Sequence, residues 1–65
     1  MTPHEERVVS EEIGLKDKLT KLEAFNVGVF IKTLPVEDQV LLREQEVYMR
    51  AYHTTLLRRI NRFEA

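Results

Sequence analysis

The first half of the chain carries apolar residues at helical spacing. They are Val8, Leu15, Leu19, Leu22 and Phe25. Steps of three, four and seven residues fit the helical period of 3.6 and cannot fit the period of two that a strand requires. Thr2 suits the N-cap, Pro3 suits the first helical position, and Glu5 completes a capping box. The pattern therefore predicts a helix over about residues 3–26.

The second half predicts a longer helix over about residues 35–63, because it holds no glycine and no proline after Pro35. At about 100° per residue, two opposite sides of this helix are apolar. One side holds Leu42, Gln45, Met49, Tyr52, Leu56, Ile60 and Phe63. The other holds Val36, Val40, Val47, Ala51 and Thr54. A helix with one neighbour buries only one such stripe, so the second stripe needs another partner.

The short segment between the two helices predicts a hairpin. Asn26 and Gly28 favour a left-handed cap at the end of the first helix. We expect Val29, Phe30 and Leu34 to fold over the open end of the hairpin, and Pro35 to begin the second helix. The fold class is all-α: one helical-hairpin domain over residues 1–65, made of two antiparallel helices.

The length of the chain argues for self-association. A domain of 65 residues buries only about 60% of its unfolded surface. Small domains of this kind rely on disulfides, metals or oligomerisation. The chain has no cysteine, and its two histidines lie far apart in sequence, so neither a disulfide nor a metal site is expected. We therefore expect a homo-oligomer that uses no metal and no cofactor.

Charge is unevenly distributed, although the net charge is only −1. Residues 1–26 hold four basic and six acidic side chains, whereas residues 47–63 hold four arginines and no acid. The low net charge does not favour DNA or RNA as a partner, although direct nucleic-acid binding through Arg50, Arg58 and Arg62 is an alternative. Arginines in a last helical turn also complement the helix dipole. No signal peptide and no membrane-length apolar run is present, which predicts an intracellular protein.

No catalytic motif is present, so we expect a binding protein and no enzyme. Arg7 and Lys18 share one flank of the first helix, and Tyr52 and Arg59 share one edge of the second. Guanidinium and ammonium groups suit phosphates, and a tyrosine ring suits a nucleobase. The competing interpretation places Tyr52 in the core with its hydroxyl bonded.

Three further polar positions have structural interpretations. Gln45 is expected to set the register between the helices. His53 is expected at a surface or an interface. Glu11 and Glu12 are expected on a solvated face, since acids at this density usually are exposed.

These residues together resemble a family of small phage proteins that includes the type-2 anti-CBASS sponges. The matching elements are Arg7-Val8-Val9, Lys18-Leu19, Lys21-Leu22-Glu23-Ala24-Phe25, Phe30, Leu34-Pro35, Asp38-Gln39, Leu41-Leu42, Gln45, Met49, Tyr52, Leu56 and Arg59-Ile60. The resemblance covers nearly the whole chain. Its elements are those of a helical hairpin, so they are more specific for fold than for function.

The resemblance implies a phage anti-defence protein that works in the host cell cytoplasm. Such proteins are homo-oligomers, typically hexamers, that sequester cyclic di- or trinucleotide messengers of bacterial CBASS immunity between subunits without cleaving them. This chain departs from the family at Glu12, where relatives often carry a lysine, and in its short N-terminal arm. The cations left for phosphates are then Arg7, Lys18, Arg59 and Arg43. The alternative function is a protein-interaction module that docks a host or phage protein through an apolar helix face.

Overall fold

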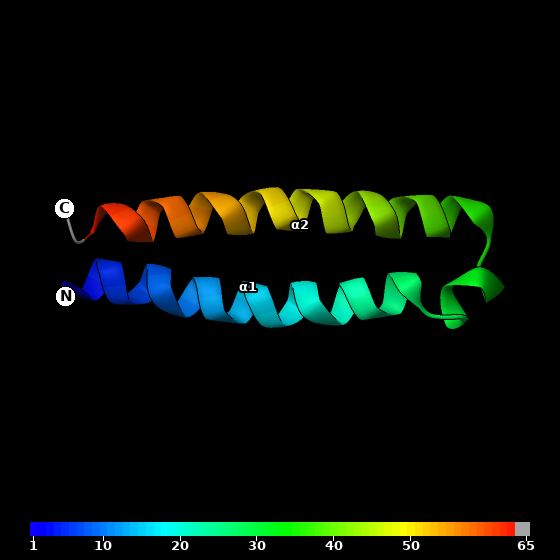
Figure 1. The fold of residues 1–65 in the computed structure, drawn as a ribbon, viewed down its shortest axis with the longest axis horizontal. Helices are drawn as coiled ribbons and strands as arrows, with labels where there is room; N and C mark the ends of the chain where they lie inside the picture. The colour runs from blue at the N-terminus through cyan, green and yellow to red at the C-terminus, as the bar shows by residue number, and fades with distance from the viewer. Residues whose placement is uncertain (64–65) are drawn as a thin grey trace.

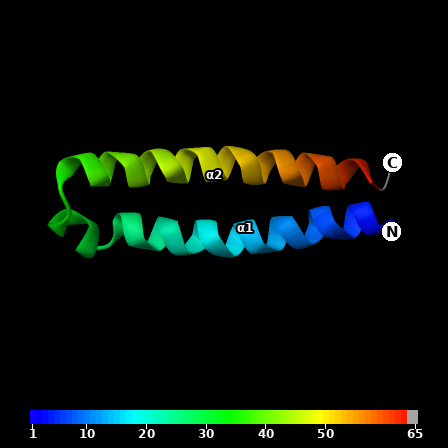
Figure 2. The same cartoon turned by 180° about the vertical axis from the view of Figure 1, so that it is seen from behind.

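The computed structural model describes residues 1–63 and shows two long antiparallel helices side by side (Figures 1 and 2). Helix α1 spans Pro3–Val27 and helix α2 spans Val36–Arg62, with a short 3-10 helix, η1, at Phe30–Thr33 between them. The start of α1 and the end of α2 lie at the end of the hairpin opposite to η1 (Figure 1). The predicted helical hairpin is therefore confirmed, with helix bounds within one residue of those expected.

The start of α1 follows the predicted capping box. The Thr2 hydroxyl accepts from the Glu5 amide at 3.2 Å, and the Thr2 amide donates to the Glu5 carboxylate at 2.8 Å. These two bonds satisfy backbone donors that a helix start leaves unpaired. The bond from the Thr2 backbone also lowers the pKa of the Glu5 carboxyl.

The core is a narrow strip where the two helices touch. Val8 and Leu19 of α1 and Leu56 of α2 are buried, while Leu15, Leu22 and Phe25 on the predicted α1 face and Leu42, Met49 and Ile60 on α2 are half-buried. The predicted α1 face and the predicted core positions of Met49 and Leu56 are thus confirmed. The core stays thin because each helix has one neighbour and hides only one stripe.

The end of the hairpin differs from the prediction. Ile31 is fully buried and closes this end, whereas Val29 and Phe30 are 80% and 64% exposed. The tight turn of η1 directs Ile31 inward, and Phe30 contacts only the edge of the Phe25 ring, at 5.9 Å between centroids. Gly28 has φ −79° and ψ 177°, so the predicted left-handed cap was wrong as well.

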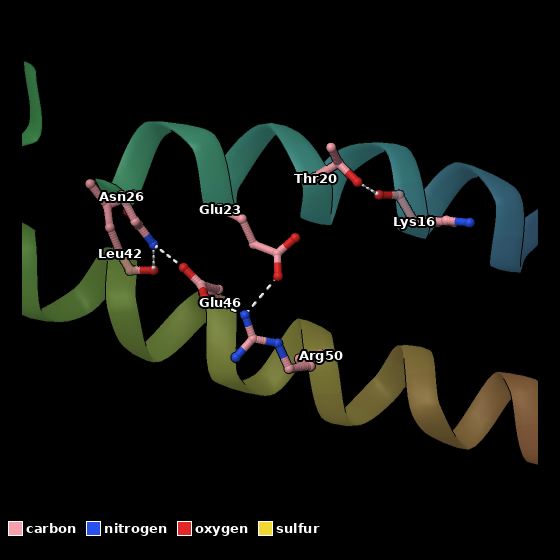
Figure 3. Close-up of polar contacts among 7 residues, drawn as sticks. All are labelled: Lys16, Thr20, Glu23, Asn26, Leu42, Glu46 and Arg50. Atoms are coloured by element: carbon pink, nitrogen blue, oxygen red, sulfur yellow. Dashed lines mark hydrogen bonds and ion pairs between the residues drawn. The ribbon is translucent and has the colours of Figure 1, made fainter. Parts of the chain in front are cut away.

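Asn26 holds the two helices in register, a role that we had predicted for Gln45. Its amide donates to the Leu42 carbonyl oxygen at 3.1 Å and to the Glu46 carboxylate at 2.8 Å (Figure 3). Asn26 is only 7% exposed, so sliding one helix along the other would leave its amide nitrogen buried without a partner. Gln45 is exposed, and its amide reaches only Met49 of its own helix.

An ion-pair network continues from Asn26 along the same edge (Figure 3). The Arg50 guanidinium lies 2.6 Å from Glu23 on α1 and 2.5 Å from Glu46 on its own helix. These two carboxylates raise the pKa of Arg50. The bond from Asn26, followed by the bond from Arg50, lowers the pKa of Glu46. The bond from Asn26 and the pair with Arg50 are therefore stronger while Glu46 is ionised, whereas the Glu23–Arg50 pair joins the helices without it.

A second polar pair joins the helices nearer the termini. His53 Nε2 lies 2.7 Å from Glu12 Oε2, and both side chains are about 85% buried, with exposed fractions of 15% and 14%. The predictions of a surface or interface position for His53 and a solvated one for Glu12 were therefore wrong. Each lies on the buried side of its helix, since Glu12 follows Val8 by four residues and His53 precedes Leu56 by three. The helical spacing therefore indicated these positions, and the prediction followed only the polar character of the two side chains.

The lowered pKa of Glu46 predicts acid sensitivity. Stability that depends on a carboxyl with a depressed pKa is present above its ordinary value of 4.5 and is lost as the pH falls through the folded value. We expect the free energy of unfolding, measured in urea, to decrease with falling pH in the range below 4.5. This decrease should be less steep in Glu46→Gln than in the parent. Glu44→Gln is the matched control, because Glu44 bonds only within its own helix, to Tyr48. Equal slopes for the parent and Glu46→Gln would contradict this assignment.

Gly14 offers a test of the outer surface of α1. It lies in mid-helix, and a Cβ added there meets no atom within 4 Å. Gly14→Ala should raise the free energy of unfolding by about 1 kcal/mol, because alanine loses less backbone freedom in a helix. Urea denaturation measures this change. A fall in stability would instead show that another copy of the chain packs closely against Gly14.

Candidate functional site

A shallow groove runs along one flank of α2, and we call it the tyrosine groove. Its residues recur every three or four positions and therefore share this flank. They are Leu41, Glu44, Gln45, Tyr48, Met49 and Tyr52. A second hollow, nearer η1, shares Leu41 and Gln45 with it and is also lined by Leu34, Asp38 and Leu42. The two hollows together form one apolar depression, open to solvent, along the first half of α2.

The groove presents aromatic surface and hydrogen-bonding groups together. Tyr48 is 66% exposed and Tyr52 is 45% exposed. The Tyr48 hydroxyl donates to Glu44 Oε1 at 3.3 Å, which ties it along the helix. Rings with a polar tip suit a ligand that is flat and polar at its edge. The alternative of a buried Tyr52 was therefore wrong for the single chain, since the contact with α1 is too narrow to reach this flank.

Arg59 continues the line of the groove toward the C-terminal end of α2. It lies seven residues after Tyr52, which is nearly two full helical turns, so both side chains leave the same flank. Arg59 is exposed. A guanidinium at the end of an aromatic groove can hold an anionic group while the rings contact an apolar or aromatic one.

Arg7 and Lys18 lie on the same side of the hairpin as the tyrosine groove. They are eleven residues apart on α1, close to three full turns, so they share one flank. The Glu23–Arg50 ion pair marks one edge of the helix contact. Lys18 on α1 and Tyr52 on α2 lie at the opposite edge of this contact. The helical period places both of them there. Arg7 and Lys18 are exposed.

Arg43 does not join this group within one chain. It precedes Tyr52 by nine residues, which places it about half a turn away, on the opposite side of α2. Arg50 is also removed from any free cationic surface, because Glu23 and Glu46 pair with it. Arg50 is one of the three arginines of the alternative prediction, direct nucleic-acid binding through Arg50, Arg58 and Arg62. Only Arg58 and Arg62 would then be available for that binding.

Sequence reasoning missed part of the groove. Leu41 and Tyr48 were not among the predicted site residues, although both recur with Tyr52 at steps of four and seven. They were missed because the whole predicted stripe, including its edge at Gln45 and Tyr52, was expected to lie against α1, so that no exposed flank beside it was considered. A signal was present in the helical period, since Leu41 and Tyr48 lie beside Gln45 and Tyr52 on the helix surface.

The arrangement places groups that can bind a ligand on one side of the hairpin. The tyrosine groove offers apolar and aromatic contact, with the cations Arg7, Lys18 and Arg59 on the same side. Among residues 1–63, no group of three metal-ligating side chains comes together. No helix in this part of the chain is long and apolar enough to cross a membrane.

The hairpin with its grooved flank defines a small helical binding protein. Residues 2–62 match the family model described as Sequestin, which covers nearly the whole chain. The chain therefore belongs to the Sequestin family, as the resemblance in its sequence indicated. This membership indicates a sequestering function. No curated protein and no solved structure matches the chain.

Proposed function

We propose that this protein is a phage anti-defence sponge that sequesters cyclic oligonucleotide messengers of bacterial CBASS immunity in the host cytoplasm. The ligand binds between subunits of a homo-oligomer, as in the hexamers that the family resemblance implies, and leaves unchanged. The observation that carries the proposal is the tyrosine groove, in which exposed rings lie on the same side of the hairpin as three cations. The chain's membership of the Sequestin family supports the same conclusion.

The proposed contacts follow from the chemistry of a cyclic oligonucleotide. Its phosphates are anionic, and Arg7, Lys18 and Arg59 are the cations on the grooved side. Its bases are flat, and base–aromatic stacking is worth about 1–3 kcal/mol per base. Tyr52 is the ring nearest to Arg59 along the groove, so it would contact a base while Arg59 contacts the neighbouring phosphate.

A second copy of the chain would complete the site. Ligand pockets normally bury most of a small molecule's surface, whereas the tyrosine groove is open along its outer side. Another hairpin laid over the groove would supply the missing wall and further cations. Arg43, which one chain places away from the groove, could reach a ligand only from such a neighbouring subunit.

A second candidate function is the docking of a protein partner. The exposed apolar residues of the groove, with Leu41 60% exposed, favour it, since a helix face of this kind fits an amphipathic helix. The two candidates differ in what accompanies the purified protein. The chain has no tryptophan and two tyrosines, so bound nucleotide would raise the absorbance at 260 nm strongly relative to 280 nm.

Calorimetric titration against a panel of cyclic di- and trinucleotides tests the proposal. We expect saturable binding at one ligand per pocket. Arg59→Ala and Tyr52→Ala should each reduce the affinity roughly tenfold or more, because one charge-assisted bond or one stacked base is worth about 1.4 kcal/mol. Lys18→Ala should weaken binding too. Its matched control is Lys16→Ala, which removes the same charge from the other flank of α1. Absence of heat with every ligand of the panel would refute the proposal.

A further inference from the structure

The outward side of α2 carries a second apolar surface, which we call the valine face. It consists of Val36, Val40 and Val47, whose exposed fractions are 74%, 52% and 58%. This surface lies about 140° around the helix from Tyr52, and it adjoins the tyrosine groove at Leu41, which lines both. Arg58 follows Val40 by eighteen residues, which is five full turns, and so it extends the same face toward the C-terminal end.

The N-terminal end of the valine face contains a shallow hollow. Val36, Glu37, Val40 and Leu41 line it. Three apolar side chains and one carboxylate suit a long side chain that has a hydrocarbon stem and a cationic tip. Arginine fits best, because its guanidinium matches the geometry of a carboxylate.

Charge is segregated along α2 and selects the direction in which a second helix can pack. Residues 36–46 hold Glu37, Asp38, Glu44, Glu46 and the single base Arg43, a net charge of −3. Residues 47–62 hold four arginines and no acid, a net charge of +4. A parallel copy would align like charges along the whole helix, which is costly, whereas an antiparallel copy aligns opposite charges.

We propose that the valine face is a two-fold interface between copies of this chain, with the two α2 helices antiparallel. Val47 lies midway between Glu37 and Arg58, so the two-fold axis passes near Val47. Arg58 of each copy then lies over the hollow at Val36 and Val40 of the other, with its guanidinium at Glu37. This contact occurs twice.

The register also brings two like charges together near the axis, where the neutralisation of one of them reduces the repulsion. It brings Arg43 of one copy level with Arg50 of the other, and Arg50 is already paired with Glu23 and Glu46 of its own chain. The interface requires no ligand and reaches the tyrosine groove only at Leu41, leaving Tyr48 and Tyr52 uncovered. It therefore does not depend on the proposed function, and either can fail without the other.

Disulfide trapping tests the direction of packing, because the chain has no cysteine of its own. In the antiparallel pair, residue 47 meets its own symmetry mate, whereas residue 40 lies fourteen residues, or about 21 Å, from its mate. A disulfide requires Cα atoms within about 7 Å. Mild oxidation should therefore cross-link Val47→Cys but not Val40→Cys, and a mixture of Val40→Cys with Thr54→Cys should give the mixed dimer.

Asp17→Cys is the background control for trapping, since Asp17 is an exposed residue of α1 whose side chain is 64% accessible. Cross-linking of Val47→Cys no faster than that of Asp17→Cys would overturn the interface. Self-cross-linking of Val40→Cys as fast as that of Val47→Cys would overturn the antiparallel direction.

Charge exchange tests the contact itself. Glu37→Arg and Arg58→Glu should each slow the trapping of Val47→Cys about tenfold, since each replaces an attraction by a repulsion at both ends of the interface. The double variant should regain most of the parent rate. Helicity by circular dichroism confirms that each variant folds. An unaltered rate in both single variants, or a double variant slower than either, would contradict the contact between Arg58 and Glu37.

Discussion

Two antiparallel helices meet along a single line, and this constraint determines most of what the chain presents to solvent. Each helix hides one stripe of side chains, and among residues 1–63 the buried apolar side chains are Val8, Leu19 and Leu56 on the helices and Ile31 in η1. A core of this size leaves little margin of stability for a domain of 65 residues. The apolar residues beyond that line remain on the surface, where they are available to ligands or to other copies.

The polar contacts at the helix interface set the register of the two helices, which the few aliphatic core residues do not set by themselves. A few aliphatic side chains in a row would tolerate sliding by one turn, because each would find a similar neighbour. Asn26 does not tolerate it, since its amide bonds to Leu42 and Glu46 at fixed positions. The pair of His53 and Glu12 acts in the same way nearer the termini. The position of α1 along α2 is therefore fixed, and a binding surface made of side chains from both helices requires this.

The surface of α2 separates into regions of different chemistry. The tyrosine groove offers rings and an amide together with Arg59, whereas the valine face offers small branched side chains and a hollow beside Glu37. Aromatic and polar groups suit a ligand that has both flat and charged parts. Branched aliphatic groups suit close packing of a second helix. One helix can thus take part in three contacts, with α1, with a ligand and with another copy.

The sequence by itself determined the two helices, their bounds within a residue, the capping box at Thr2 and the surplus of apolar surface on α2, because these follow from local periodicity and composition. It could not determine which edge of the apolar stripe of α2 faces α1, and Leu41 and Tyr48 were therefore missed. That choice depends on contacts between residues far apart in the chain, such as Asn26 with Leu42 and Glu12 with His53. Only the tertiary structure decided them, because a periodic stripe has the same pattern whichever of its edges is buried.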